Sequence, residues 1–593
     1  MSDDPQLIDC FKNACSIFDI NAIDSHQALC DSLDTLAGDL GKDKQARIQL
    51  GAADVWADIS KLWQGLVHAQ LTFWDGDDSD DGEDGGSTAS AKEKRKQHSL
   101  CALCISLARF TRNLVAGVPA NQVKAFENEP IIRRLLHYYT SWSSLQDEEG
   151  KACVSFRITL TDISSENIAT FAARILTQML SNIITGNETL ISSLWETYLN
   201  LQEDQVVLIR LLASPDSRIL LAVMTMITSC LHESRSRTKL LTRAAIGARI
   251  CVALLDNMVK LYDADEASDG ARAFDVGYSI FARIIECGLM SDLYVKLAMP
   301  EEIVTPHQTT LLKLLDSYLQ SASASSPGTR SRITKTHSRL CSMLSNLFFS
   351  LSSFAQMAIR RFLRPVPSGH NSDELASPAE LDVFLPKVCE ALVLVTQCII
   401  TITLAAQGPQ SQFHGASALT GSPSASAQEN AHVFFNQARF EGISLAESLV
   451  EILRLLDRFI PRINFRKPVV GAGNAVQPTD KTESPAPHST AIPGSDSPGF
   501  NFLKRDLVRL LGILCNEDKA VQDRLRKCGG IEVVMNLCVI DKRNPYLREH
   551  AIFTLHNLLK DNLANQAVVE EIKPMGRWDE DGILRDTPGA VRK

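Results

Sequence analysis

The chain has 593 residues, of which 45% are hydrophobic and 22% are charged. This balance excludes a wholly disordered protein, because enough apolar surface is available to offset the conformational entropy lost on folding. The formal net charge of −10 argues against a general binder of nucleic acid or anionic membranes, since neither polyanion would be attracted over long range. Aromatic residues contribute 6% while Leu, Ala, Ile and Ser dominate the apolar stretches, which favours stacked helices over β-sandwiches.

In chain order, helical patterns alternate with polar segments rich in Gly, Pro, Ser or charge, and we expect these polar segments to be disordered. The predicted segments are an N-terminal helical region (1–74), a loop with an acidic and then a basic block (75–97), helical repeats (98–365), a loop (366–380), helical repeats with a low-complexity insertion at 407–430 (381–466), a Pro/Ser/Gly-rich linker (467–499), a C-terminal helical domain (500–574) and a tail (575–593).

Compartment and membrane contact are inferred from the N-terminus, the cysteines and one apolar run. The first residues are acidic and lack the basic and apolar parts of a secretory signal. Fifteen cysteines lie mostly within helical patterns, which is typical of reduced thiols, so we expect a cytoplasmic protein. The apolar run Ala391 to Ala406 is shorter than the roughly 20 residues needed to cross a bilayer. We therefore expect a buried helix and no membrane span.

Internal similarity is the most informative pattern. RNLVAGVPANQ around Asn113 and HNLLKDNLANQ around Asn557 share NL, five residues and ANQ, and MLSNI at Asn182 is matched by MLSNL at Asn346. Each of these asparagines falls at the end of a long apolar helical pattern and precedes a polar turn.

The stretch Gly529 to Glu571 contains one complete repeat, with a short helix after Gly-Gly, a second helix that ends in leucine–Xaa–Asn–Leu and a third that opens with Asn-Gln. It looks like an armadillo repeat, a unit that buries its apolar faces only when neighbours stack on it. Upstream, Leu507, Leu510, Leu511 and Leu514 give the spacing of a core-facing helix. The predicted fold class is all-α, an armadillo/HEAT-like α-solenoid with several disordered loop insertions.

The C-terminal block Phe502 to Pro574 resembles the C-terminal domain of the ataxin-10 family. The resemblance is carried by LCN at Leu514 to Asn516, VQD at Val521 to Asp523, GGI at Gly529 to Ile531, NPYLREHAI at Asn544 to Ile552, and the HNLL and NQ that follow. Family members often carry Arg where this chain has His556, and insertions near 80 and 480 suggest a fungal member. The resemblance implies a cytoplasmic, non-enzymatic protein associated with cytokinesis and protein binding; some fungal relatives carry a copper-transport name.

No catalytic or cofactor motif appears in the sequence. The chain lacks a phosphate-binding loop and the HExxH, GxSxG and kinase signatures, so we expect neither an enzyme nor a bound cofactor. Cys101 and Cys104 form a CALC pair that two thiolates could use to hold a soft metal, but no second pair completes four ligands. A pair of small core residues is the simpler interpretation.

Asn113, Asn182, Asn346 and Asn557 are the candidate binding residues, because a carboxamide can both donate to and accept from the backbone of an extended peptide. The alternative is that each asparagine ties down its own turn or helix end. The leading functional hypothesis is a non-enzymatic scaffold that binds other proteins during cell division. The alternatives are an adaptor that binds basic peptides in a groove, and a protein of copper homeostasis.

Overall fold

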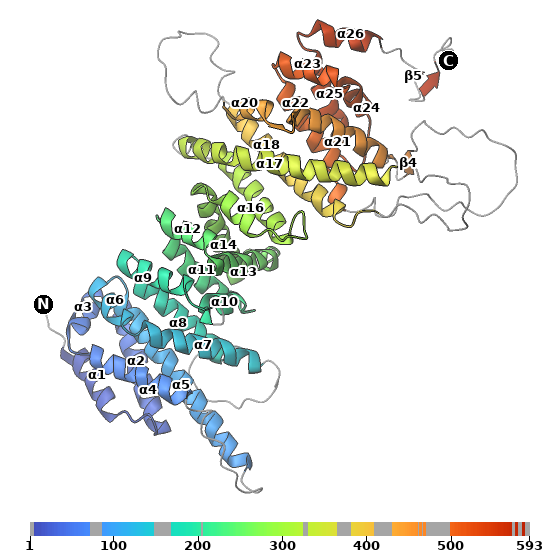
Figure 1. The fold of residues 1–593 in the computed structure, drawn as a ribbon. Coiled ribbons are helices and arrows are strands. Elements are labelled where there is room, and N and C mark those ends of the chain that lie inside the picture. Colours follow the sequence, from blue (N-terminus) through green and yellow to red (C-terminus); the bar gives the residue numbers. More distant parts are fainter. Residues whose placement is uncertain are drawn as a thin grey trace, which may run out of the picture. The chain divides into compact units, whose positions relative to one another are not determined.

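The structure is a computed structural model that describes residues 5–71, 86–146, 168–202, 205–323, 330–364, 381–407, 430–460, 462–464, 467–469, 498–571, 576–578 and 584–586. The chain divides into two compact units, Met1–Lys296 and Leu297–Lys593, and each is described by itself. Helices dominate both units (Figure 1).

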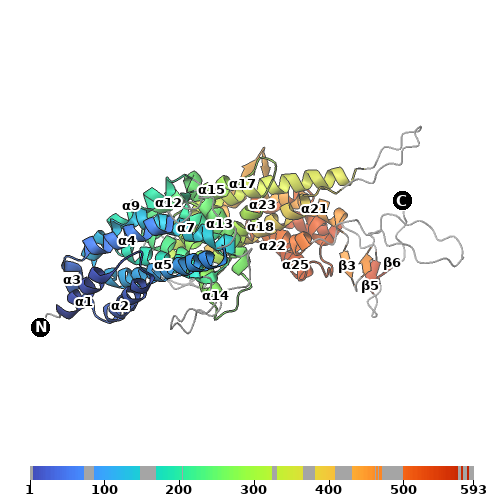
Figure 2. The same cartoon turned by 90° about the horizontal axis from the view of Figure 1, so that it is seen from below.

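Unit 1 is an α-solenoid in which a helix stacks on the helix three places before it in the chain (Figures 1 and 2). The first layer contains α2 (Ile23–Lys42), α5 (Gly86–Val115), α8 (Ile168–Ile184), α11 (Ser217–Leu231) and α14 (Asp269–Glu286). The second contains α4 (Trp56–Leu71), α7 (Glu129–Gln146), α10 (Val207–Leu212) and α13 (Ala245–Leu261). Shorter helices connect the two layers: α3 (Lys44–Ala52), α6 (Pro119–Phe126), α9 (Glu188–Leu199), α12 (Arg235–Arg243) and α15 (Met290–Lys296); α1 (Pro5–Ile17) packs on α2.

The stacking depends on apolar stripes and on close approach between helices. Ile280 and Ile284 of α14 are buried one helical turn apart, as a core-facing stripe requires. Gly277, one turn before Ile280 on α14, lies against Met258 and Met224. A Cβ on Gly277 would lie 2.6 Å from the sulfur of Met258. Its missing side chain therefore lets α13 and α14 pack together.

One turn recurs where a first-layer helix ends and a short helix follows. The residue in the turn has a positive φ at Gly117 (67°), Gly186 (76°), Glu233 (50°), Gly288 (70°), Glu517 (58°) and Asp561 (54°). Glycine adopts this left-handed conformation without the steric cost that a Cβ imposes. The next residue frequently caps the short helix, as Asn187 does by accepting a hydrogen bond from the backbone N–H of Leu190.

Unit 2 repeats the same architecture near the C-terminus. Its first layer contains α16 (Pro306–Ser323), α18 (Leu385–Gln407), α22 (Leu503–Cys515) and α25 (Leu547–Leu559), and its second contains α17 (Arg330–Phe362), α21 (Leu445–Phe459) and α24 (Gly530–Asn536). The shorter helices are α20 (Asn430–Gln437), α23 (Lys519–Lys527) and α26 (Leu563–Glu571), and a 3-10 turn, η5 (Pro498–Phe500), contacts α18. The predicted all-α solenoid is thus confirmed.

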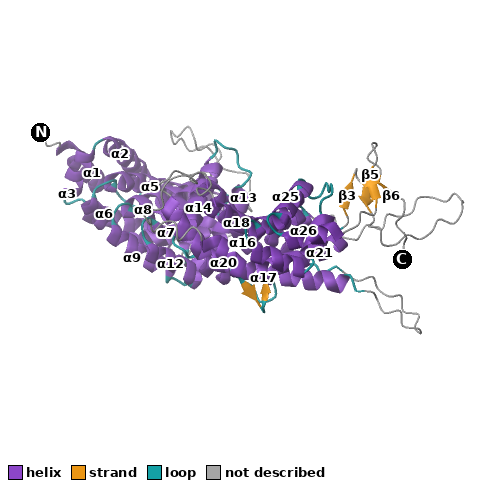
Figure 3. Ribbon diagram, turned by 90° about the horizontal axis from the view of Figure 1, so that it is seen from above, coloured by secondary structure: helices purple, strands orange, loops and turns teal. Residues whose placement is uncertain are grey.

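The strands within the described ranges form three short antiparallel pairs (Figure 3). They are β1 (Arg439–Phe440) with β2 (Ile443–Ser444), β3 (Arg462–Asn464) with β4 (Lys467–Val469), and β5 (Gly576–Trp578) with β6 (Leu584–Asp586). The last two pairs fall in or beside the predicted linker and tail, where no strand is predicted.

One predicted boundary is corrected, and several predicted loops cannot be compared. Helix α5 begins at Gly86, inside the loop predicted over 75–97, because the small and basic residues after the acidic block are compatible with helix. The loops at 366–380 and 408–429 and most of the linker at 467–499 lie outside the described residues.

Helix α18 contains the apolar run of the sequence, and it is long and apolar enough to cross a membrane by length and composition. Within unit 2 it packs against α16, α17 and α22, and Cys389, Leu392 and Val395 are fully buried there. This packing supports the predicted buried helix.

Contact between α22 and α25 gives a test of the stacking. A Cβ at Gly512 would lie 2.4 Å from Oγ1 and 3.3 Å from Cα of Thr554, so Gly512→Ala should lower the free energy of unfolding of unit 2 by about 1–3 kcal/mol. Urea unfolding of the full chain, followed by circular dichroism, measures this. Gly38→Ala is the control: nothing lies within 4 Å of that position on α2, so stability should stay equal or rise by up to about 1 kcal/mol. Equal midpoints for the two variants would contradict the close packing.

Candidate functional site

Three of the four predicted asparagines form hydrogen bonds between stacked helices. The side-chain amide of Asn113 on α5 donates to the carbonyl of Ala37 on α2 at 2.8 Å. Asn182 on α8 donates to the carbonyl of Arg112 at 3.3 Å, and Asn557 on α25 donates to the carbonyl of Gly512 at 3.0 Å. Arg112 and Gly512 lie in the last turns of their helices, where carbonyls have no partner within the helix. These asparagines therefore link each helix to the one before it.

The asparagine of each ANQ triplet closes the turn. Asn121 donates to the carbonyl of Leu114 at 2.9 Å, and Asn565 donates to the carbonyl of Leu558 at 2.7 Å. In unit 1, Arg237 has the same role toward the carbonyl of Cys230, at 2.5 Å. Each donor thus reaches back to the end of the preceding first-layer helix and satisfies a carbonyl that the helix leaves unpaired.

The peptide-groove hypothesis is corrected at Asn557. This side chain is 3% exposed, and its amide is bonded within the stack, so no surface remains there for a peptide. Asn113 and Asn182 are half-buried with their donors engaged in the same way. Asn346 on α17 is exposed, and a contact with a peptide there stays a prediction. The geometry favours the structural alternative at the other three positions.

Asn257 is a linking residue that the sequence reading missed. Its amide donates to the carbonyl of Leu212 at 2.7 Å, between α13 and α10 of the second layer. The surrounding LLDNM has the same apolar–Xaa–Asn–apolar order as MLSNI at Asn182. A search for that pattern without the following Asn-Gln would have found it.

The thiols of the CALC pair are core groups in this structure. Cys101 and Cys104 are fully buried near Tyr139, and burial raises the pKa of Cys104 to about 12 and that of Cys101 well above its usual value. Since the thiolate is the form that binds metal, this environment disfavours metal binding. Among the described residues, no three His, Cys, Asp or Glu side chains group so as to hold a metal ion.

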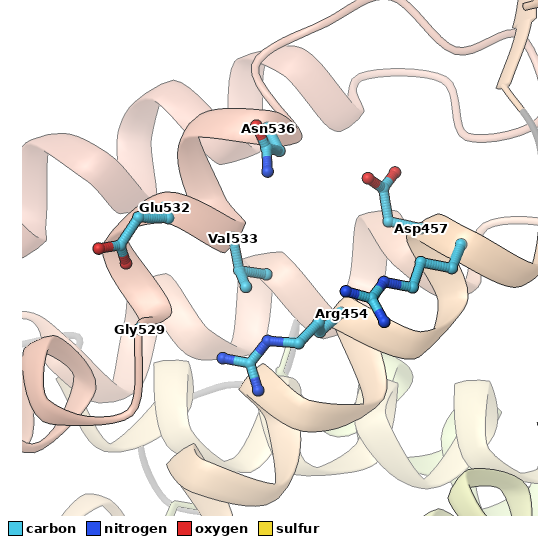
Figure 4. A pocket seen from close by; sticks show the side chains of 7 residues that line it. Arg454, Asp457, Gly529, Glu532, Val533 and Asn536 are labelled. Atoms are coloured by element: carbon cyan, nitrogen blue, oxygen red, sulfur yellow. The ribbon is translucent and has the colours of Figure 1, made fainter. Parts of the chain in front are cut away.

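A polar pocket of about 360 Å³ opens between α21 and α24 (Figure 4). Arg454 lies across it, donating to Glu451 at 2.5 Å and to the carbonyl of Cys528 at 2.6 Å. Asp457 accepts from Arg462 at 3.2 Å and from the buried Lys504 at 3.4 Å. These charges join α21 to the following repeat, and the lining contains no Ser, Cys or His that could act as a nucleophile or base.

The last first-layer helix, α25, has an apolar surface that no described residue covers. We define the terminal face as Ile552 and Phe553 of α25 together with Leu563 at the start of α26, which are 49%, 59% and 80% exposed. Ile552 lies nine residues before the left-handed residue Asp561, and Val508 lies nine residues before the left-handed residue Glu517, so the two hold equivalent positions in successive repeats. Val508 is fully buried, and its carbonyl accepts a hydrogen bond from Thr554 of α25. The spacing of Ala551, Ile552, Leu555 and Leu558 predicts one core stripe, but Ile552 is exposed while Ala551 and Leu558 are buried.

Comparison with known families bears on this C-terminal domain. A sequence model of the spinocerebellar ataxia type 10 protein domain matches residues 503–589. The C-terminal domain is thus an ataxin-10 family domain. An ataxin-10 homolog of Dictyostelium discoideum is 38% identical over 89 residues, which are 15% of this chain and 14% of the relative.

Other ataxin-10 relatives match similar parts of the chain. A Kluyveromyces lactis ataxin-10 homolog is 29% identical over 23% of this chain and 28% of its own length, and human ataxin-10 is 34% identical over 13% and 17%. The matched part is thus less than a third of each relative. Among solved structures, a complex of SYS-1 with POP-1 is aligned over 95% of this chain and 94% of its own, with 10% identity and a TM-score of 0.33.

The linking role of Asn557 can be separated from surface binding by comparing two substitutions. Asn557→Ala removes the amide that donates to the buried carbonyl of Gly512, which keeps only the weak thiol donor Cys515, and should cost about 1–3 kcal/mol of stability. Asn346→Ala removes an exposed side chain and should change stability by less than about 0.5 kcal/mol. Thermal melts of both variants measure this. Two equally stable variants would show that the buried amide is dispensable.

Proposed function

We propose that this ataxin-10 family protein is a non-enzymatic scaffold that binds partner proteins through the terminal face of its C-terminal domain. The observation that carries the proposal is the exposure of Ile552 and Phe553 on a helix whose preceding counterpart is covered. Burial of such side chains contributes about 1.5–3 kcal/mol each, so a partner that covers both gains substantial binding energy.

The occupant that the geometry suits is an amphipathic helix of a partner protein. Within the domain, the surface around Val508 is covered by α25, which approaches closely at Gly512 and donates from Thr554 to the carbonyl of Val508 at 3.0 Å. The terminal face offers the same kind of surface one repeat later. A helix with small and apolar residues along one side would continue the stack there.

The setting of this scaffold is proposed to be the cytoplasm of dividing cells, as the ataxin-10 resemblance implies. The helical-repeat fold and the family are typical of non-enzymatic proteins. The two alternatives find less support. Buried thiols do not favour a copper site at the CALC pair. The charged side chain bonded to Asn113 is that of Arg112, where an adaptor for basic peptides would need a carboxylate.

Polar substitution of the terminal face should abolish partner binding without unfolding the chain. Ile552→Asp/Phe553→Asp should reduce the recovery of specific partners at least about tenfold in affinity purification from native cells, because two charges replace apolar contacts. Val259→Asp is the matched control, since Val259 of α13 is 62% exposed and lies in unit 1.

Direct binding completes this test. A helical segment from any partner lost in the double variant should bind the purified wild-type chain and not the variant, by fluorescence anisotropy. Unchanged partner recovery would refute the use of this face, and loss of a wild-type dimer in sedimentation would identify a second copy of the chain as the occupant instead of a partner helix.

The link to cell division has its own test. Cells that lack the protein should accumulate unfinished divisions, and expression of the wild type or of Val259→Asp should restore normal division while Ile552→Asp/Phe553→Asp should not. Counting multinucleate or joined cells measures this. Full rescue by the double variant would show that cell division does not require the terminal face. Normal division in the deletion strain would show that the protein is not needed for cytokinesis.

A further inference from the structure

Helix α17 of unit 2 is basic and contains no acidic residue. Its 33 residues include six arginines and lysines and no aspartate or glutamate, although the formal net charge of the chain is −10. The helix runs along one edge of unit 2 (Figures 2 and 3). Leu344, Phe348 and Leu351 on its inner side are buried. Its apolar side is therefore already covered, and its outer side remains in contact with solvent.

One exposed stripe follows the outer side of α17. Asn346, Ser350, Ser353 and Met357 are exposed and succeed one another at intervals of three or four residues, which is the spacing of one helix face. Arg361 is exposed and continues this spacing at the end of the helix. The stripe thus leads from an amide through small side chains and a thioether to a cation.

Two arginines at this end are exposed and have no partner in the part of the chain that the structure describes. Neither Arg361 nor Arg364, which follows just beyond the helix, forms a side-chain hydrogen bond or ion pair with another described residue. Their guanidinium groups are therefore open to an anion from outside. We define the basic stripe as Asn346, Met357, Arg361 and Arg364.

The end of α17 is held in place by α21. The rings of Phe362 and Phe459 meet edge to face, with 5.4 Å between their centroids. Arg360 donates to Glu451 of α21 at 2.8 Å. The carboxylate of Glu451 also accepts from Arg454 at 2.5 Å, so two cations already share it and it does not neutralise the basic stripe.

We propose that the basic stripe binds an extended acidic segment of a partner protein, at a place separate from the terminal face. Arg361 and Arg364 can each pair with a carboxylate through two parallel hydrogen bonds. The exposed amide of Asn346 can bond a peptide backbone, and Met357, which is 53% exposed, offers an apolar contact between them. From Asn346 to Arg361 the helix rises about 22 Å, which about seven extended residues span.

Burial and charge favour a peptide over a membrane or a nucleic acid. Because the apolar side of α17 is buried, the helix has no free apolar face that could enter a bilayer. The net charge of −10 would repel a long polyanion, whereas a short acidic segment meets only the local excess of cations.

A labelled peptide of about ten residues, with alternating glutamate and serine and one central leucine, tests the proposal. Fluorescence anisotropy with the full chain at low ionic strength should show binding of this peptide, weakened by added salt, and no binding of its glutamine counterpart. Arg361→Gln/Arg364→Gln should weaken binding about tenfold. Arg134→Gln/Lys239→Gln is the matched control: it removes two exposed cations of α7 and α12 and should leave binding unchanged.

Three further variants separate binding from folding. Met357→Ala should weaken binding of the leucine peptide about threefold but not that of the same peptide with serine for leucine, a difference that misfolding does not produce. Asn346→Ala should weaken both peptides about twofold. Ile552→Asp/Phe553→Asp should bind the peptide as the wild type does, because the terminal face lies on another helix.

Several outcomes would overturn the proposal. They are absence of binding, equal weakening by Arg134→Gln/Lys239→Gln, and equal effects of Met357→Ala on the two peptides. Tighter binding of single-stranded DNA of the same length, or of phosphatidylcholine vesicles that contain phosphatidylserine, would replace the peptide by a nucleic acid or a membrane.

Discussion

The fold depends on satisfying the carbonyl groups that remain unpaired where each helix ends. In a stack of short helices such ends are frequent, and many of them are buried. This chain meets the need with side-chain amides: one asparagine donates to the helix before it, and another, eight residues later, closes the turn, as Asn557 and Asn565 do. The left-handed residue between them reverses the chain so that both donors reach their targets.

This arrangement explains why the repeated asparagines stand out in the sequence without forming a binding ladder. A carboxamide serves equally well in linking helices and in holding a peptide, so residue type alone does not distinguish the two roles. Burial does, and Asn557 lies inside the stack. A surface with binding potential is instead built from residues that the repeat does not need, Ile552 and Phe553 of α25.

Much of the fold follows from the sequence because helical periodicity and core burial coincide. Leu507, Leu510, Leu511 and Leu514 were expected to face a core, and all four are fully buried. Helical periodicity predicts burial wrongly at Ile552, because an apolar residue at the right spacing does not reveal whether another helix is present to cover it. It also could not reveal that Arg109 of α5 lies over the ring of Phe171 of α8, because the stacking of helices distant in sequence brings these residues together.

The hydrogen bonds between stacked helices also bear on how such a chain is made. Those of Asn257 and Asn557 join residues 45 apart, and those of Asn182 and Asn113 join residues 70 and 76 apart. Each new helix thus needs only the stretch synthesised just before it, and within a unit folding can advance from one repeat to the next. In the domain with the family's sequence signature, α22 is synthesised before α25, so the apolar surface around Val508 stays uncovered until α25 has left the ribosome.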